Sequence, residues 1–383
     1  LDVSITDPGG ASGTDKLQFG ELNGFSGDAV SNSDNLGVVL IANLVTEVYE
    51  ITIAGRSYPL TLNAMGQSGN CYICNPLTAY IDYALDETRN FAAHPALRRA
   101  IRALVQACAP LVRASGLDHQ VQVNNWLFST NPVPTITTVA AAALRDGLIA
   151  THPDRAVVLR SLNDTADCAS LAALREAGFR LLPARQIYLF GGDGTGARPS
   201  SNMKQDTQAI ARSGLQTVAN DGFDVDDYAR SAVLYDMLYI DKYTALNPRF
   251  TARYIRAMHE AGLMQMHGLR DPADGRLMAV TGLFENGRTL TQPIVGYDTS
   301  RPMKKGLYRM VMAMAQHHAR RQGLFFNMSA GAGSFKRRRQ AVPVIEYNAV
   351  YVDHLPKTQR IAVRLMEEIL TRTGIPLLKR FEL

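Results

Sequence analysis

The chain has 383 residues, of which 46% are hydrophobic and 20% are charged. This is ordinary globular composition, which excludes a disordered or collagen-like chain. A chain of this length usually divides into two domains. The formal net charge of +5 mildly favours an anionic partner, such as a phosphorylated cofactor, a carrier protein or RNA, without choosing among them.

The sequence has no apolar run of about 18 or more residues, so we expect no membrane partner. Its start, LDVSITDPGG, has neither the basic flank nor the apolar stretch of a secretory signal. We therefore expect a cytoplasmic protein. The sequence does not indicate an oligomeric state.

The four cysteines are too few to hold a fold of this size together by disulfides. Cys71 and Cys74 form one CxxC, but neither a second pair nor a histidine follows at the spacing of a zinc site. We expect no metal, and we expect these two cysteines to be small buried side chains in a strand.

The clearest boundary lies at residues 191–201, GGDGTGARPSS, which are rich in Gly, Ser and Pro. A dinucleotide fingerprint would need an apolar helix opening directly from the glycines. Polar residues follow here, so the pattern favours a linker. We expect an N-terminal domain at 1–190, a linker at 191–222 and a C-terminal domain at 223–383.

The first half alternates strand and helix signals. Residues 38–53 are apolar and β-branched, which predicts strands that meet at a turn. Helical spacing follows at 95–115, then a short buried strand at 156–160, a helix at 169–177 and strands over 179–190.

The second half gives a more specific order. Helices are predicted at 235–247 and 251–260, then three strands at 263–269, 276–284 and 289–297, the last two joined by the hairpin pair Asn286-Gly287. Helix and strand signals then alternate along the chain, in the order helix 306–322, strand 324–328, helical turn 334–340, strand 344–352, helix 358–371 and strand 377–382. An antiparallel meander followed by β-α-β-α-β is an unusual arrangement.

The segment TSRPMKKGLYRM leaves a strand and opens the long helix at Gly306. A helix N-terminus offers free backbone N–H groups and the positive end of the helix dipole, which suits a pyrophosphate. Arg301, Lys304 and Lys305 add positive charge, and Gly306 allows a close backbone approach. The alternative is a solvated basic loop. We take as candidate donor-binding residues Arg301, Lys304, Lys305, Gly306, Leu307 and Tyr308.

This loop and the order of elements resemble the GNAT superfamily of acyltransferases. In that family the loop after the fourth strand holds the pyrophosphate of the donor, with the pattern Gln/Arg-x-x-Gly-x-Gly/Ala. Arg301 and Gly306 match its ends, while Lys304 stands where the pattern has its first Gly. The resemblance implies coenzyme A binding, and a Lys at this position can contact a phosphate as a point charge.

A second segment, residues 327–351, runs from a strand through a turn of small residues to Phe335-Lys336 and a further strand. It resembles the Fem-type peptidoglycan-bridge transferases and related doubled GNAT proteins, in which an aromatic-Lys pair follows such a turn. The resemblance implies that Lys336 stabilises the negative charge that develops in acyl transfer, with Phe335 packing the site. A fixed cation at a tetrahedral oxyanion contributes a few kcal/mol.

Acyl transfer to an amine also needs a proton acceptor and a donor for the leaving group. Glu346 lies on the following strand and is our candidate base, although it is equally consistent with a paired structural carboxylate. Ser329 and Tyr308 are candidate hydrogen-bond donors to the leaving group.

The first half also resembles the doubled family, at Arg56-Ser57-Tyr58-Pro59-Leu60 and at residues 72–87. It contains no recognisable pyrophosphate loop, so we interpret it as a degenerate copy. The expected fold class is therefore α/β (α+β), with two tandem GNAT-like domains, each a mixed, mostly antiparallel sheet flanked by helices.

The resulting hypothesis is an N-acyltransferase, with no tightly bound cofactor, that uses acyl-CoA or an acyl-carrier protein as donor. Its acceptor is the amine of a small molecule or an amino acid. The first alternative uses aminoacyl-tRNA and forms a peptide bond, with the basic clusters at 301–309 and 336–339 on the acceptor-stem phosphates. The second alternative is a non-catalytic binding protein on a GNAT fold.

Overall fold

The computed structural model describes residues 3–6, 40–53, 56–63, 71–88, 95–191 and 198–381. They form two compact units. Unit 1 holds the described residues of 3–6, 43–186 and 345–381, and unit 2 holds those of 40–42 and 187–344.

The sheet of unit 1 has the order β1-β2-β3-β4-β5-β12. Its strands are β1 (Val3–Thr6), β2 (Glu47–Ile53), β3 (Arg56–Asn63), β4 (Gln120–Val123), β5 (Ala156–Asn163) and β12 (Val342–Tyr351). Neighbouring strands are antiparallel except β4 and β5, which are parallel. The helix α4 (Thr138–Thr151) connects that parallel pair.

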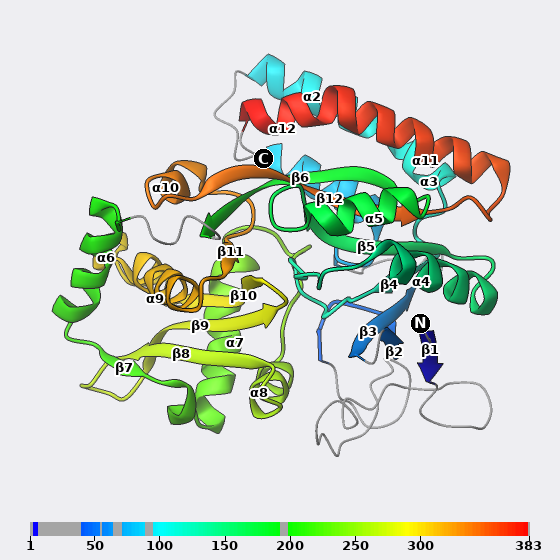
Figure 1. The fold of residues 1–383 in the computed structure, drawn as a ribbon. Helices are drawn as coiled ribbons and strands as arrows, with labels where there is room; N and C mark the ends of the chain where they lie inside the picture. Colours follow the sequence, from blue (N-terminus) through cyan, green and yellow to red (C-terminus); the bar gives the residue numbers. More distant parts are fainter. Residues whose placement is uncertain are drawn as a thin grey trace. The chain divides into compact units, whose positions relative to one another are not determined.

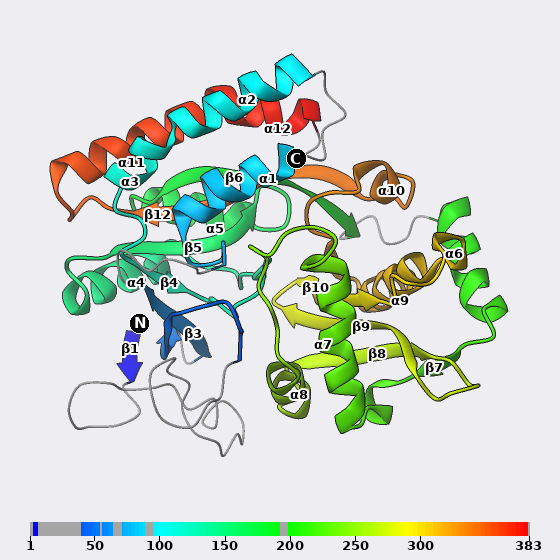
Figure 2. The same ribbon diagram turned by 180° about the vertical axis from the view of Figure 1, so that it is seen from behind.

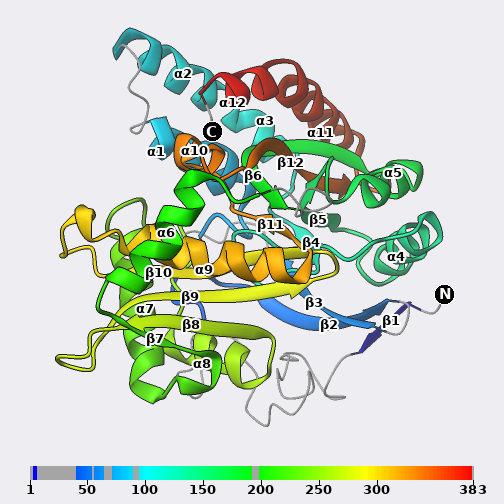
Figure 3. The same ribbon diagram turned by 60° about the vertical axis from the view of Figure 1, so that its left-hand side comes forward.

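Both faces of this sheet are covered by helices. One hydrophobic cluster packs α4 and α5 (Cys168–Glu176) against the sheet, and these two helices lie side by side in Figure 3. A second cluster on the other face includes residues of α3 (Ala109–Ala114) and α11 (Lys357–Ile369). The remaining helical segments of unit 1 are a π-helical turn (Thr78–Asp82), α1 (Tyr83–Glu87), α2 (Pro95–Ala107), a second π-helical turn (Leu370–Gly374) and α12 (Ile375–Phe381).

The sheet of unit 2 repeats this pattern in the order β7-β8-β9-β10-β11-β6. Its strands are β7 (Gln216–Val218), β8 (Met264–Arg270), β9 (Leu277–Asn286), β10 (Thr289–Tyr297), β11 (Phe325–Asn327) and β6 (Arg180–Gly191). Only β10 and β11 are parallel, and α9 (Leu307–Gln322) connects them.

The helices α7 (Val225–Tyr239) and α9 cover opposite faces of the β8–β10 meander, as the two views in Figures 1 and 2 show. The helix α6 (Ser201–Arg212) lies against α9. Two 3₁₀ turns (Asn220–Gly222 and Met303–Lys305), α8 (Ala252–Glu260) and α10 (Gly333–Arg337) complete the unit.

The two units exchange their last strands. The strand β6 starts in unit 1, and its final residues pair with β11 in unit 2. The strand β12 starts in unit 2 and pairs with β5 in unit 1. Each half of the chain therefore supplies the strand that completes the sheet of the other half. The expected fold class, two tandem mixed and mostly antiparallel sheets flanked by helices, is confirmed.

Several expectations for local structure are corrected. The structure groups residues 345–381 with unit 1, so the domain boundary at 223–383 does not follow its units. The proposed linker at 191–222 contains helix α6, which begins at the N-cap Ser200. Of the predicted strand at 377–382, residues 377–381 belong to helix α12, and residue 382 lies outside the described residues. Cys71 and Cys74 are buried as expected, but neither lies in a strand: Cys74 lies in a turn and Cys71 just before it.

Candidate functional site

The parallel strands β10 and β11 of unit 2 pair over a short distance only. Their register runs from Thr289 opposite Phe325 to Thr291 opposite Asn327. The strand β10 continues to Tyr297, past an irregularity against β9 between Thr291 and Ile294. The carboxyl-terminal half of β10 therefore has no partner from β11, and the loop that follows it leads directly to α9.

The loop between β10 and α9 is held by Asp298. Its carboxylate accepts hydrogen bonds from Arg230 Nη2 (3.0 Å) and from both Ser300 N and Ser300 Oγ. Burial raises the pKa of Asp298, but the hydrogen bonds from Ser300 and the charge of Arg230 outweigh it and lower this pKa overall. A fixed carboxylate thus anchors the loop at its start.

Gly306 stands at the junction of this loop with α9. Its φ of 73° is in the left-handed region, and a Cβ added there would lie 2.6 Å from Arg309 Nε. The helix α9 starts at the next residue without a side-chain cap. The first-turn N–H groups of a helix have no partner within the helix, so they are suited to an anion at this position.

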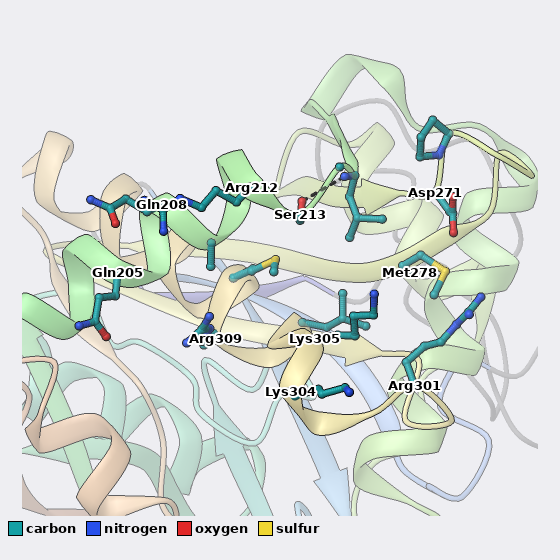
Figure 4. A pocket seen from close by; sticks show the side chains of 16 residues that line it. Gln205, Gln208, Arg212, Ser213, Asp271, Met278, Arg301, Lys304, Lys305 and Arg309 are labelled. Carbon is teal, nitrogen blue, oxygen red and sulfur yellow. Dashed lines mark hydrogen bonds between the residues drawn. The ribbon is translucent and has the colours of Figure 1, made fainter.

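A pocket of about 550 Å³ lies at this end of α9. Its lining comes from the β10–α9 loop and the first turn of α9, from α6 with the residues that follow it, and from the β8–β9 turn with the start of β9. Figure 4 shows Arg301, Lys304 and Lys305 on the loop side and Gln205 and Arg212 on the α6 side.

The pocket is strongly cationic. Its charged lining residues are Arg212, Arg301, Lys304, Lys305, Arg309 and the single acid Asp271. Within the described parts of the chain, no ion pair or hydrogen bond involves the side chains of Arg301, Lys304 and Lys305. Like charges left without partners in one pocket favour an anionic ligand that carries several charges.

A buried carboxylate connects one wall of the pocket to Arg339, which follows α10. Asp206 on α6 is 1% exposed and accepts two hydrogen bonds from Arg339, at 2.6 and 3.1 Å. Arg309 Nε lies 3.8 Å from the same carboxylate. Because Arg309 lines the pocket, Asp206 links the pocket to the segment that carries Phe335 and Lys336.

Lys336 is 2% exposed, and its ammonium group holds a strained turn. Lys336 Nζ donates to the carbonyl oxygens of Ser329 (3.0 Å) and Ala330 (2.8 Å) and lies 5.5 Å from the centre of the Tyr188 ring. Ser329 has a φ of 61°, which is unusual for a residue with a side chain. The ammonium therefore fixes the turn that follows β11.

Two hydroxyl groups of unit 2 are available as donors. Tyr308, in the first turn of α9, has its ring centre 5.2 Å from that of Phe335. Burial raises the pKa of Tyr308, so its phenol stays protonated at neutral pH. Ser329 is half-buried, and its hydroxyl has no hydrogen bond within the described residues.

Glu346 lies in unit 1, whereas the other candidate residues lie in unit 2. It is 2% exposed, and its two oxygens accept hydrogen bonds from Arg185 Nε (2.7 Å) and Nη2 (3.2 Å). Thus the candidate base is a paired carboxylate in this structure.

The structure brings the candidate residues of unit 2 into two groups. Arg301, Lys304, Lys305 and Leu307 line the pocket, with Gly306 at the helix start. In the second group, a ring contact joins Tyr308 to Phe335, and the next residue, Lys336, donates a hydrogen bond to the backbone of Ser329. The sequence analysis missed the contribution of α6. The signal that could have revealed this helix is a serine at its N-cap. The side chain of Ser200 accepts a hydrogen bond from the backbone N–H of Met203.

No group of three or more His, Cys, Asp or Glu side chains within the described ranges could hold a metal ion. Nor is any described helix both long and apolar enough to cross a bilayer.

No family model matches this sequence, and no curated protein matches it. Solved structures do resemble it. The C-terminal domain of a putative lysylphosphatidylglycerol synthetase from Agrobacterium fabrum is 14% identical, with a TM-score of 0.42, covering 61% of this chain and 77% of that chain. FemX is 10% identical, with a TM-score of 0.43, covering 60% of this chain and 79% of that chain.

A tandem GNAT protein from the clavulanic acid biosynthesis pathway is 11% identical, with a TM-score of 0.33. The comparison covers 82% of this chain and 85% of that chain. Fem-like and tandem GNAT proteins, the two groups that the sequence motifs resemble, are thus both among the structure neighbours.

Proposed function

We propose that the protein is an acyltransferase, in which unit 2 binds an activated acyl donor through its phosphates and passes the acyl group to an amine. The observation that carries this proposal is the pocket at the start of α9, with its unpaired cations Arg301, Lys304 and Lys305. A coenzyme A thioester offers several phosphates for it, and the phosphopantetheine arm of an acyl-carrier protein offers one.

The local chemistry supports transfer rather than binding alone. Attack of an amine on a thioester produces a tetrahedral oxyanion and then releases a thiolate, which must gain a proton. The phenol of Tyr308 is protonated, and the hydroxyl of Ser329 lies on the turn held by Lys336. We assign Tyr308 and Ser329 as candidate donors to the leaving sulfur. Lys336 either stabilises the oxyanion directly or supports it by fixing the turn.

A second donor class is favoured by a separate observation. Arg337 and Arg338 are exposed on α10 and just after it, so their positive charge can reach a large polyanion. Aminoacyl-tRNA is such a donor, and with an amine acceptor it gives a peptide bond. Arg339 does not belong to this exposed group because it is buried against Asp206.

Donor binding distinguishes these possibilities. Thermal-shift and calorimetric titrations with acyl-CoA, acyl-carrier protein and charged tRNA should yield one donor class that binds, and the Lys304→Ala/Lys305→Ala double variant should weaken its binding by at least about 10-fold. Arg338→Ala should leave a coenzyme A donor unaffected but should weaken tRNA binding and flatten its salt dependence. If no class binds, or if the double variant binds normally, the proposal is wrong.

A further inference from the structure

One face of the unit 1 sheet is unusually polar. In the parallel ladder Gln122 stands opposite Val158, so Gln120 and Gln122 share a face with Val158 and Arg160. The segment 71–75 lies across this face: Gln122 Nε2 donates to the carbonyl of Ile73 (3.2 Å), and Gln120 Nε2 donates to that of Cys74 (3.0 Å). Buried polar side chains in a sheet core are costly, so they usually serve a purpose beyond stability.

The backbone around this face is strained at the carboxyl ends of both parallel strands. After β4, Asn124 and Leu127 have φ values of 58° and 60°, and Ser161 on β5 has a φ of 69°. All three are almost fully buried. The register of β5 against β12 shifts between Tyr347 and Ala349, so Arg160 and Ser161 form a bulge. Such outliers cluster at functional sites, and a bulge redirects the side chain it carries.

Two atoms on this face are left without partners. Gln122 is 2% exposed, and its Oε1 has no hydrogen-bond partner within the described residues. Arg160 Nη1 is likewise buried without one, while its Nη2 has only a long contact of 3.5 Å to the carbonyl of Ser129. An acceptor on Gln122 and a charged donor on Arg160, both without a partner in the described residues, therefore lie on neighbouring strands and on the same face.

The charges around Arg160 define what can bind there. Arg185 is paired with Glu346, so its charge is neutralised, whereas Arg160 has no ion pair within the described residues. Tyr80 is close to Arg160, and its hydroxyl accepts a hydrogen bond from Asn348 Nδ2 (2.9 Å), which leaves its own proton free to donate. One net positive charge suits a single carboxylate better than a phosphate with two charges.

We propose that unit 1 binds a free α-amino acid at this position, with its carboxylate on Arg160 and Tyr80 and its ammonium group on the carbonyl oxygen of Gln122. The ammonium supplies the N–H donor that Gln122 lacks, and the carboxylate supplies the acceptor that Arg160 lacks. Arg160 and Tyr80 are half-buried residues, but Arg160 Nη1 and Gln122 Oε1 are themselves buried, so the ligand enters only when the groups that cover these two atoms move. This binding does not depend on the proposed function of unit 2.

In this site Glu346 has a positioning role. Both of its oxygens accept from Arg185, and Arg185 Nη2 also donates to the carbonyl of Ser129 and to Thr130 Oγ1, each at 2.8 Å. The carbonyl of Ser129 is the group that Arg160 Nη2 contacts. The pair thus holds the loop that orients Arg160, without itself taking up a proton.

Calorimetry on the full chain with the free L-amino acids, in the absence of any acyl donor, tests this inference. We expect at least one amino acid to bind, and we expect acetate and methylamine at the same concentration not to bind, since each offers only one of the two groups. Arg160→Gln and, as a second variant, Gln122→Met should each raise the Kd by about 10- to 100-fold. Arg175→Gln, an exposed arginine of the same unit, is the matched control and should not change it.

The outcomes separate this inference from the proposed function. If no amino acid binds, the polar face holds water only and the inference is overturned, even if acyl donors bind at Lys304 and Lys305. If amino acids bind but Arg160→Gln leaves the Kd unchanged, they bind elsewhere and the inference is again overturned. If an amino acid binds through Arg160 but no donor class binds, the amino-acid site of unit 1 is supported and the acyltransferase proposal is wrong.

Discussion

Gly306 is the N-cap of α9, at the end of the loop that lines the proposed donor pocket. Gly306→Val should raise the Kd of the donor strongly, by 10-fold or more, because the added side chain would displace Arg309 and block the backbone approach. The measurement is a donor titration on the folded variant. Gly323→Ala is the matched control: it has a similar φ of 67° at the other end of α9, with nothing within 4 Å. Equal effects of the two changes would show only a general loss of α9.

Lys336 combines a buried charge with two hydrogen bonds to a turn. Lys336→Met should lower kcat by roughly 10²- to 10³-fold while the Kd of the donor changes little. It should also lower the free energy of unfolding by about 1–3 kcal/mol, since two carbonyl groups lose their donor. Steady-state kinetics below the melting temperature would check the first effect, and Arg338→Met provides an exposed control. Near-normal turnover would exclude Lys336 from the mechanism.

Asp167 gives the stability of the protein a distinctive dependence on pH. Burial raises the pKa of Asp167 to about 7, although hydrogen bonds from Asn163 act in the opposite direction. An unfolded Asp titrates near pH 4, so between about pH 4 and 7 the folded state binds the extra proton. The contribution of Asp167 to the free energy of unfolding therefore falls as the pH rises through that window.

Asp167→Asn should remove this contribution, because an amide carries no titratable proton. Denaturant unfolding from pH 4 to pH 7 should show the parent chain losing stability relative to the variant as the pH rises. Asp164→Asn, an exposed site three residues earlier, should keep the parent profile. Parallel profiles for Asp167→Asn and the parent would contradict the assignment.

At the scale of an element, α10 is preceded by two adjacent residues with positive φ, one of which is suited to that conformation and one of which is not. Gly331 and Ala332 are exposed and have φ values of 74° and 51°, but only glycine adopts this region without strain. Ala332→Gly should raise the free energy of unfolding by about 0.5–1 kcal/mol, and Gly331→Ala should lower it by about 1 kcal/mol. Chemical denaturation measures both, and changes of the same sign would show that local packing outweighs backbone strain.

The elements that the sequence predicted well are those with a clear local pattern. Turn residues separate β8 from β9, and a hairpin pair separates β9 from β10. The helix α9 ends at Gly323. The positions of these elements therefore follow from neighbouring residues. The helix α12 has too few residues to distinguish an apolar helical turn from a strand. The mostly polar helix α6 follows a glycine-rich segment, which made it look like part of a linker.

The candidate site was predicted in part for the same reason. The loop from Arg301 to Gly306 has a local signature of charge and glycine before a helix, and it lines the pocket. Asp206 and Arg339 form an ion pair although they are far apart in the sequence, and no local sequence pattern predicts such a contact. Arg160 and Gln122 were missed because the bulge that redirects Arg160 depends on pairing with β12.

At the scale of the whole molecule, the clearest expectation concerns metal ions. The buried thiols of Cys71 and Cys74 are poor metal ligands, since burial raises the pKa of Cys71 to about 12 and also raises that of Cys74. Dialysis against a chelator should therefore leave the melting temperature and any transferase activity unchanged. Elemental analysis of the purified chain provides the complementary measurement, and stoichiometric zinc would contradict this expectation.

The exchange of β6 and β12 between the two sheets has a consequence for how the protein is made. On a ribosome, β5 is finished at Asn163, while its neighbour β12 starts only at Val342. At a translation rate of about 5–20 residues per second, this edge of β5 stays unpaired for roughly 10–40 s. An unpaired strand edge can pair with other chains, so the nascent protein has a long interval in which this edge is exposed to aggregation. Release of a chain truncated before β12 would make that vulnerable edge permanent.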